Sequence, residues 1–196
     1  MVSKVIPKDA MLIPDTAERV FNGIIYDVYH WQQELYDGSF TTFEMLRRLD
    51  TVETIGVVGD TVLLIEDEQP NRSMRLSVPS GRVEADERIL DAAKREMLEE
   101  TGHQFKNWRL LNVRQPQAKV ESFVHLYVAW GGEQSSSQHL DAGEKITVDP
   151  ASFERLKQLI ADKVGYLGEL EPVLEGCSSI EDVLALPEFT GEVVER

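Results

Sequence analysis

The sequence predicts an α/β (α+β) protein in which a mixed β-sheet lies between two helices. This is an α/β/α sandwich with an antiparallel strand extension ahead of it. Short apolar runs separated by turn signals predict the strands, and two longer segments with helical apolar spacing predict the covering helices. The 196 residues, 42% of them hydrophobic, suit one packed core with appendages. We expect residues 1–50 to form the strand extension, 51–164 the central domain and 165–196 a C-terminal tail.

The N-terminal part favours a small antiparallel sheet. Residues 20–29 and 31–36 mix β-branched and aromatic side chains, and they lead to Asp37-Gly38, a strong turn signal. Residues 39–48 alternate again after that turn.

The central strands are indicated by short apolar segments. Residues 54–66 hold two apolar runs around Gly59-Asp60, which predicts a hairpin. Further strands are expected at residues 75–78, 108–113 and 122–130. The last of these is apolar at nearly every position, which is typical of a strand buried on both faces. The Gly- and Ser-rich residues 131–137 are expected to form a flexible loop.

The first helix is expected to begin near Asp86 or Glu87 and to end at Gly102. Leu90, Ala93 and Met97 form its core-facing stripe. A second helix is expected within residues 150–164, with Pro150 and Ser152 at its start, and a short one within residues 179–186.

Charge and composition limit the partners. A net charge of −15 argues against nucleic acid, since binding it relies on Lys and Arg. No apolar stretch is long enough to span a bilayer, so no membrane partner is expected. The single cysteine, Cys177, cannot form an internal disulfide, and a cytoplasmic location is the simplest setting. A small phosphorylated substrate remains compatible, because a bound divalent cation reverses the local field.

The window that indicates the chemistry is residues 81–103. Glu99 and Glu100 follow Glu96 by three and four residues. On a helix this spacing places all three carboxylates on one side. Like charges at that spacing repel, whereas a hard divalent cation such as Mg²⁺ binds through carboxylates together with substrate phosphates. The alternative is an ordinary solvated helix face. Such a face favours Glu–Lys pairs four residues apart, but here Glu96 faces Glu100.

The same window resembles the Nudix box. A Gly is followed by five residues and a Glu, then by seven residues and an Arg-Glu pair that opens the final block. The matching residues are Gly81, Glu87, Arg95, Glu96, Met97, Glu99, Glu100 and Gly102. Only His103 departs, where an apolar residue is usual. The chain thus resembles a Nudix hydrolase, and the resemblance implies the Nudix-type α/β/α sandwich.

Candidate metal ligands follow from this window. Glu96 and Glu100 are expected to bind Mg²⁺ (Mn²⁺ is possible), with Glu99 as a third ligand. The resemblance implies that the carbonyl of Ser80 helps them. Glu87 either joins the metal site or places its charge at the positive end of the helix.

The expected catalytic residues are Arg95, Glu99, Glu100 and Glu121. Arg95 is expected to orient a glutamate, Glu87 above all, by a bidentate salt bridge. Glu121 is the only carboxylate in the segment 116–122, and it is the candidate base or additional ligand; the alternative is a loop glutamate in water.

Three residues are candidates for substrate binding. Arg47 and Arg72 could grip a diphosphate bidentately, the alternative being surface arginines. Trp31 could stack on a base, although aromatic residues in a strand are more often part of the core.

Ahead of the box, a strand pair, the turn at Asp37-Gly38, a segment that ends in Arg47-Arg48 and a hairpin follow one another; after it come Pro116 and the segments 125–129 and 144–148. This order, over roughly residues 20 to 165, is similar to that of the branch that cleaves ADP-ribose and nucleoside-diphosphate sugars. Ser77 departs from it, because a Glu is usual there. The resemblance implies hydrolysis of ADP-ribose to AMP and ribose 5-phosphate, and a homodimer joined through the N-terminal strands. The alternatives are a Nudix hydrolase of nucleoside triphosphates or dinucleotide polyphosphates, and a non-catalytic nucleotide-sensing module.

Overall fold

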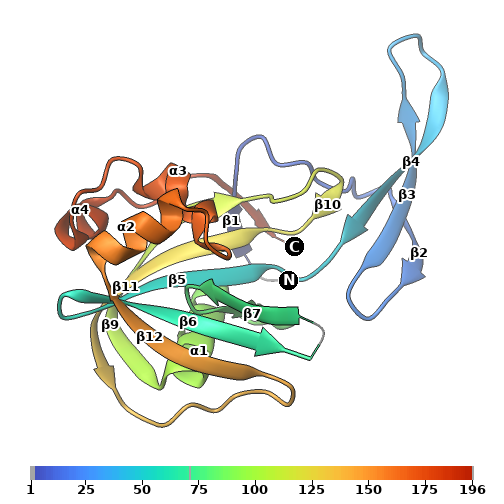
Figure 1. Ribbon diagram of the computed structural model, residues 1–196. Coiled ribbons are helices and arrows are strands. Elements are labelled where there is room, and N and C mark those ends of the chain that lie inside the picture. The colour runs from blue at the N-terminus through green and yellow to red at the C-terminus, as the bar shows by residue number, and fades with distance from the viewer. Residues whose placement is uncertain (1–2, 71, 196) are drawn as a thin grey trace.

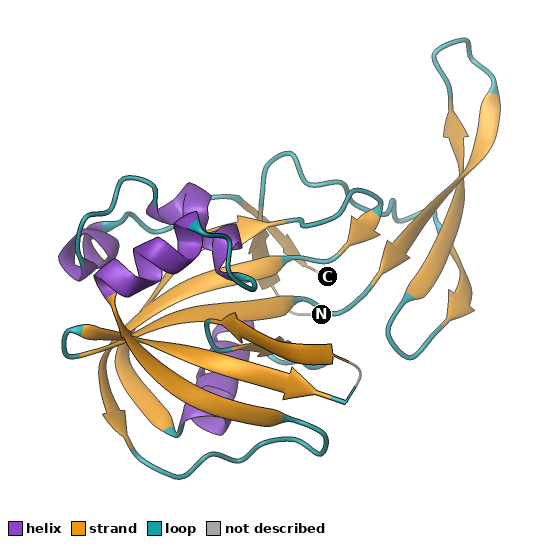
Figure 2. Ribbon diagram, viewed as in Figure 1, coloured by secondary structure: helices purple, strands orange, loops and turns teal. Residues whose placement is uncertain are grey.

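The computed structural model describes residues 3–70 and 72–195. Within these residues a seven-stranded mixed sheet forms the centre, with one helix on one face and the remaining helices on the other (Figures 1 and 2). Its strands are β5 (Thr51–Val58), β6 (Thr61–Gln69), β7 (Arg72–Ser77), β8 (Ser80–Arg82), β9 (His103–Arg114), β11 (Val124–Gln134) and β12 (Lys145–Ser152). The helices are α1 (Ile89–Thr101), α2 (Phe153–Ala161), the 3₁₀ helix η1 (Leu167–Leu170), α3 (Glu171–Leu174) and α4 (Ile180–Ala185). The predicted α/β/α sandwich is confirmed.

The strand order is β12-β6-β5-β11-β9. The β5–β11 pair is parallel, and the other pairs along this path are antiparallel. β5 and β6 form the predicted hairpin at Gly59 and pair only near it. Farther from the turn they diverge, and there β7 pairs with β6 and β8 pairs with β5. The strand that leads into α1 is therefore held beside the middle of the sheet.

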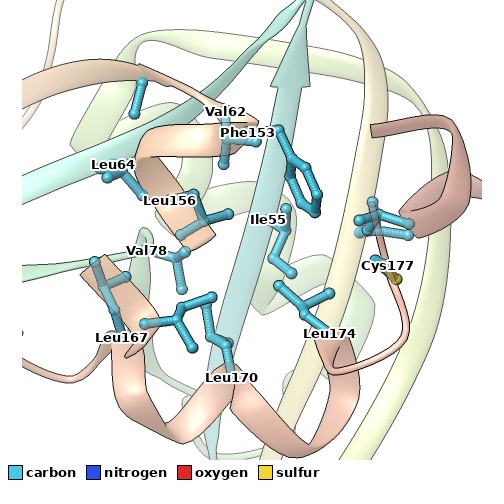
Figure 3. Packing of buried hydrophobic residues seen from close by; sticks show 14 of the residues in the cluster. Ile55, Val62, Leu64, Val78, Phe153, Leu156, Leu167, Leu170, Leu174 and Cys177 are labelled. Carbon is cyan, nitrogen blue, oxygen red and sulfur yellow. The ribbon is translucent and has the colours of Figure 1, made fainter. Parts of the chain in front are cut away.

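Two apolar clusters pack on the two faces of the sheet. Leu126 and Val128 of β11 belong to the cluster under α2, while Tyr127 belongs to the cluster under α1. Both faces of this strand are therefore buried, as its continuous apolar sequence predicts. Figure 3 shows Phe153 and Leu156 of α2 against Ile55 of β5 in the first cluster.

The residues from 165 onward pack against the body of the molecule. Leu167, Leu170 and Leu174 are buried in the cluster under α2, and so is the free Cys177 (Figure 3). Ser179 caps α4 with a capping box, in which its hydroxyl accepts from the N–H of Asp182. The chain then returns to the N-terminus, where β13 (Glu192–Glu195) pairs with β1 (Ser3–Ile6).

Part of the N-terminal segment projects from the body as an arm, residues 18–47 (Figure 1). The arm is an antiparallel sheet of β2 (Glu18–Asn22), β3 (Asp27–Glu34) and β4 (Phe40–Arg47). The short β10 (Val120–Glu121) pairs with the end of β4 and fastens the arm to the body. The turn at Asp37-Gly38 is confirmed, with a φ of 81° at Gly38.

The structure corrects the expected bounds at the N-terminal side. The predicted strand at 20–29 is two strands, because the N–H of Gly23 donates to the carbonyl of Tyr26 and closes a turn. Helix α1 begins at Ile89 rather than near Asp86 or Glu87. Asp86 has a φ of 63°, a left-handed conformation that an α-helix cannot contain.

Two further expectations are corrected after the box. Residues 131–134 continue β11 instead of opening a loop, and Gly132 pairs with Phe105. A Cβ at position 132 would lie 2.4 Å from the Phe105 ring, so the glycine permits this close pairing. Pro150 lies in β12, and Ser152 alone caps α2 by accepting from the N–H of Arg155. In the described part of the chain no helix has both the length and the apolarity to cross a bilayer.

Candidate active site

The box glutamates are held beside β8 by close packing of α1 against that strand. Ala92, Ala93 and Met97 form the buried face of α1, and the helix ends at Gly102, whose φ is 72°. A Cβ at Gly81 would lie 1.9 Å from Cδ of Glu96. Only a glycine leaves room for the Glu96 carboxyl group at this point.

Glu100 is the most buried of the box carboxylates, with 5% of its surface exposed. Its Oε2 accepts a hydrogen bond of 2.8 Å from the N–H of Ser80. Burial, and then the charges of Glu96, Glu144 and Asp67, raise the pKa of Glu100 well above its usual value. Burial also raises the pKa of Glu96, although its bond with Arg95 offsets part of this effect.

Arg95 binds three of the box glutamates at once. It forms a bidentate pair with Glu87, with Nε and Nη2 each 2.9 Å from a carboxylate oxygen. Its Nη1 donates to Glu96 at 2.7 Å and to Glu99 at 3.0 Å. Nη2 also donates to the carbonyl of Arg82 at the end of β8. The bidentate pair with Glu87 lowers the pKa of that carboxyl group.

The loop after β11 closes the C-terminal end of α1. The last carbonyls of a helix have no partner within it, and here the loop supplies donors for them. The N–H of His139 donates to the carbonyl of Glu99 at 2.9 Å, and the amide of Gln138 donates to that of Glu100 at 2.5 Å. This anchoring brings Glu144 of the same loop to the pocket that the box glutamates line.

Arg95, Glu144 and the box glutamates Glu96, Glu99 and Glu100 line a pocket of about 510 Å³, here called the glutamate pocket. Among the described residues its charged lining consists of six carboxylates and three guanidinium groups, besides His139. The carboxylates are Glu84, Glu96, Glu99, Glu100, Asp141 and Glu144, and the guanidinium groups are those of Arg48, Arg82 and Arg95. The pocket therefore carries an excess of negative charge, which favours a cation.

The donor set fits a hard divalent cation, because it consists of carboxylate oxygens in a partly buried pocket. Burial, and after it the charges of neighbouring carboxylates, raises the pKa of Glu96 and of Glu100, so a bound cation would stabilise their charged forms. Within the described ranges no three His, Cys, Asp or Glu side chains converge as a ready-made metal cage. Arg95 accounts for part of this, since it draws Glu96 and Glu99 toward its own guanidinium group.

The structure does not bring Glu121 to the glutamate pocket. It is 3% exposed, and both carboxylate oxygens are engaged: Oε1 accepts from Arg47 at 2.9 Å and Oε2 from the N–H of Ile13 at 2.6 Å. It is therefore not a loop glutamate in water either. Arg47 also lies against Tyr29, with Cζ 4.6 Å from the ring centroid. Together Arg47 and Glu121 line the groove between the arm and the body.

Of the other expected residues, Trp31 and Arg72 lie outside the glutamate pocket, whereas Ser80 and Glu87 contact its residues. Trp31 lies on the arm, where its ring contacts Phe43 at 5.2 Å between centroids, and it lines none of the pockets described here. Arg72 pairs with Asp67, whose charge acts on Glu100, but it does not line the glutamate pocket. Ser80 lies next to the box glutamates and contributes its N–H to Glu100. Glu87 precedes the helix and binds Arg95 instead of capping the first turn.

Several residues of the glutamate pocket were not predicted from the sequence, among them Arg48, Asp141 and Glu144. Arg48 immediately follows the expected Arg47, and alternation along a strand sends neighbouring side chains to opposite faces. The alternation therefore predicts that one of the two arginines faces the body, but it does not tell which of them does. Asp141 and Glu144 lie close together in the loop before β12. Two acidic residues in one loop are the sequence feature that could have indicated a contribution to the site.

Comparison with known proteins agrees with this geometry. A family model, the NUDIX domain, matches residues 48–169. The methanol dehydrogenase activator of Bacillus methanolicus and the ADP-ribose pyrophosphatase of Bacillus subtilis are each 24% identical, over 153 and 156 residues. Each match covers 76% of this chain and 83% of the relative. The crystal structure of an ADP compounds hydrolase covers 89% of this chain and 98% of its own, with a TM-score of 0.65 and 21% identity. The chain therefore belongs to the Nudix family and is a hydrolase that acts on pyrophosphate bonds.

Proposed function

We propose that this hydrolase requires a divalent metal ion and cleaves the diphosphate linkage of a nucleoside diphosphate joined to another moiety. ADP-ribose or a nucleoside-diphosphate sugar is the proposed substrate, with AMP and ribose 5-phosphate as the products from ADP-ribose. The observation that carries the proposal is the gathering of Glu96, Glu99, Glu100 and Glu144 in one pocket. The likeness to an ADP-ribose pyrophosphatase supports the choice of substrate.

The box glutamates are the proposed metal ligands. Glu96, Glu99 and Glu100, with the carbonyl of Ser80, would hold Mg²⁺ or Mn²⁺. The ion, when bound, polarises the phosphoryl oxygens and acidifies a water molecule. Arg95 would act as a positioning residue, because it binds Glu96 and Glu99 directly and Glu87 bidentately. Glu87 would then orient Arg95 instead of binding the metal itself.

Glu144 replaces Glu121 as the proposed general base. A base must reach the attacking water within hydrogen-bond distance, and Glu144 lines the glutamate pocket while Glu121 does not. The charge of Glu144 acts on both Glu96 and Glu100, which supports its closeness to the proposed ligands. Its loop carries it in, anchored on the end of α1 by Gln138 and His139.

We also propose a homodimer and a cytoplasmic location. Large apolar side chains stand in solvent on the arm: Phe21 is 60% exposed, Ile24 99% and Phe40 63%. A second copy that covers the arm would remove this surface from water. Light scattering coupled to gel filtration should give twice the mass of one chain. The substitution Phe21→Glu should lower the measured mass toward that of one chain. A single-chain mass for the unaltered protein would refute the dimer.

The substrate assignment is tested by a product screen. Purified protein with Mg²⁺ should release AMP and ribose 5-phosphate from ADP-ribose in equal amounts. Nucleoside triphosphates and dinucleotide polyphosphates are the comparison substrates. A triphosphate cleaved far faster, with release of free pyrophosphate, would overturn the substrate. Activity undiminished by a chelator would overturn the metal requirement.

A further inference from the structure

A second polar pocket, of about 490 Å³, lies beside η1, where β5 and β11 begin and β9 ends. It is here called the arginine pocket, because Arg48, Arg72 and Arg114 line it. It adjoins the glutamate pocket. Arg48 lines both, and Ser80 in its wall is followed directly by Gly81 in the wall of the other.

Two of these arginines keep hydrogen-bonding capacity that the described protein does not use. The Nε atoms of Arg72 and Arg114 are shielded from solvent and have no hydrogen-bond partner among the described residues. The carboxylate of Glu169 is 3.7 Å from Nε of Arg114, too far for a hydrogen bond. Buried donors of this kind cost free energy unless something accepts from them.

The charges of the arginine pocket favour an anion. The chain has a net charge of −15, yet three guanidinium groups line this pocket, beside the carboxylates of Glu53 and Glu169. Arg72 also pairs with Asp67, outside the lining, whereas the Arg48 guanidinium forms no ion pair with a described residue. Both carboxylates are directed at Arg114: Glu53 by a bidentate pair at 3.0 and 3.1 Å, Glu169 at the longer distance. Planar guanidinium groups bind phosphate oxygens well.

The remaining lining suits a sugar better than a nucleobase. Thr51, Ser77 and Gln117 offer hydroxyl and amide groups for a polyol. The only aromatic residue in the lining is Tyr166, within the described chain. Arg72 and Arg75 already lie near its ring, with Cζ 5.8 and 4.9 Å from the centroid. The pocket therefore offers no open ring on which a base can stack.

We infer that the arginine pocket receives the phosphorylated sugar half of the substrate, such as the ribose 5-phosphate half of ADP-ribose. This inference rests on the proposed function. Arg72 binds the phosphate next to the sugar, and Arg114, fixed by Glu53, lies beside it. The diphosphate then lies between the two pockets, beside Arg48 and Ser80, and extends into the glutamate pocket. Tyr166, directly before η1, and Glu169 within it line the sugar side of the pocket.

Binding of the two reaction products tests this inference without any turnover. Titration calorimetry in Mg²⁺ measures the Kd of ribose 5-phosphate and of AMP for the wild type, Arg72→Gln and Arg75→Gln. Arg75 is the matched control, because it also contacts Tyr166 but does not line the arginine pocket. We expect Arg72→Gln to weaken ribose 5-phosphate binding roughly tenfold, as loss of one charge-assisted hydrogen bond would, and AMP binding by less than about twofold. Arg75→Gln should change neither by more than that.

A wild-type measurement guards against misfolding of the variant. In protein labelled with ¹⁵N-arginine, the Nε–H signals of Arg72 and Arg114 should shift with ribose 5-phosphate and stay in place with AMP. Equal weakening by Arg72→Gln and Arg75→Gln, unchanged binding in both, or no detectable binding of ribose 5-phosphate overturns the inference. If ADP-ribose is hydrolysed but Arg72→Gln leaves the Kd of ribose 5-phosphate unchanged, this inference alone fails. If ribose 5-phosphate binds through Arg72 but no diphosphate is cleaved, the proposed function alone fails.

Discussion

Gly81 lies directly against the carboxyl group of Glu96. A Cβ at position 81 would stand 2.1 and 2.2 Å from the two carboxylate oxygens. The missing side chain lets α1 approach β8, and the same approach brings the N–H of Ser80 within 2.8 Å of Glu100. One glycine thus governs the position of two carboxylates in the glutamate pocket.

Gly81→Ala should therefore lower activity far more than stability. The atoms that the new methyl group would meet are the end of a flexible side chain, so Glu96 swings away and the backbone need not move. We expect activity to fall roughly tenfold or more, as when support of a metal ligand is lost. The free energy of unfolding should change by less than about 1 kcal/mol. Gly176→Ala is the control, because a Cβ there meets nothing within 4 Å. Equal activities in the two variants would contradict the prediction.

Glu100→Gln should remove activity while the fold persists. The amide oxygen of Gln can still accept from the N–H of Ser80, but its neutral side chain binds a divalent ion poorly. Metal-dependent hydrolysis should fall at least about 10²-fold, more than for loss of a supporting residue. Stability should not fall, since burial disfavours the carboxylate charge. Rates at several Mg²⁺ concentrations and thermal unfolding measure both effects. Glu154→Gln, on the exposed first turn of α2, serves as the comparison; full activity in Glu100→Gln would refute its role as a ligand.

Arg95→Lys should disorder the box glutamates although the charge is kept. A single ammonium group cannot reproduce the bidentate pair with Glu87 and also reach Glu96 and Glu99. We expect about 1–3 kcal/mol lower stability and a higher Mg²⁺ concentration for half-maximal activity. Arg88→Lys is the control, because Arg88 is exposed and lies 3.9 Å from Asp91. Unchanged Mg²⁺ dependence in Arg95→Lys would show that the guanidinium group does not position the ligands.

The parts of the site that sequence could predict are those fixed by local periodicity. Helical spacing alone places Glu96, Glu99 and Glu100 on one side, and Gly102 marks the helix end. The buried strand at 122–130 is also local, since both of its faces are apolar. These features need no knowledge of which segments meet in space.

Sequence could not show which loop reaches the glutamates. The segment 116–122 and the loop before β12 both carry acidic residues beside a strand. Contacts distant in sequence decide between them: Ile13 and Arg47 bind Glu121 away from the pocket. Gln138 and His139 bind the end of α1 and bring Glu144 into it. The pairing of β1 with β13 is hidden in the same way, because its partners stand at opposite ends of the chain.

Glu144→Gln and Glu121→Gln should separate the chemical and structural roles. Loss of a general base costs roughly 10²-fold or more in kcat, which is expected for Glu144→Gln with little change in stability. Glu121→Gln weakens the charge-assisted bonds from Arg47 and Ile13, so it should lower the unfolding midpoint instead. Steady-state kinetics on ADP-ribose and chemical unfolding measure the two effects. The reverse pattern, with kcat lost only in Glu121→Gln, would return the base to Glu121.

Asp50 should make stability depend on pH. It is 6% exposed, and it accepts from Lys4 of β1 at 2.6 Å and from the N–H of Phe123 at 3.0 Å. His125 of β11 lies 3.3 Å from its Oδ2. Burial alone would raise the pKa of Asp50, but the bond with His125 and the charge of Lys4 outweigh it, so the pKa is lowered.

A carboxyl group whose pKa is lower in the folded state stabilises the fold above its unfolded pKa, and this stabilisation is lost as pH falls through the folded value. The difference in unfolding free energy between wild type and Asp50→Asn should thus be greatest above about pH 4 and shrink below it. Near pH 7 it should be about 3 kcal/mol, because Asn leaves the Lys4 charge uncompensated. Asp149→Asn, which breaks a pair with the exposed Arg155, should cost far less, because solvent screens that pair. Urea unfolding between pH 3 and pH 7 measures each difference. A gap for Asp50→Asn that stays constant or widens toward low pH would mean that its charge does not stabilise the fold.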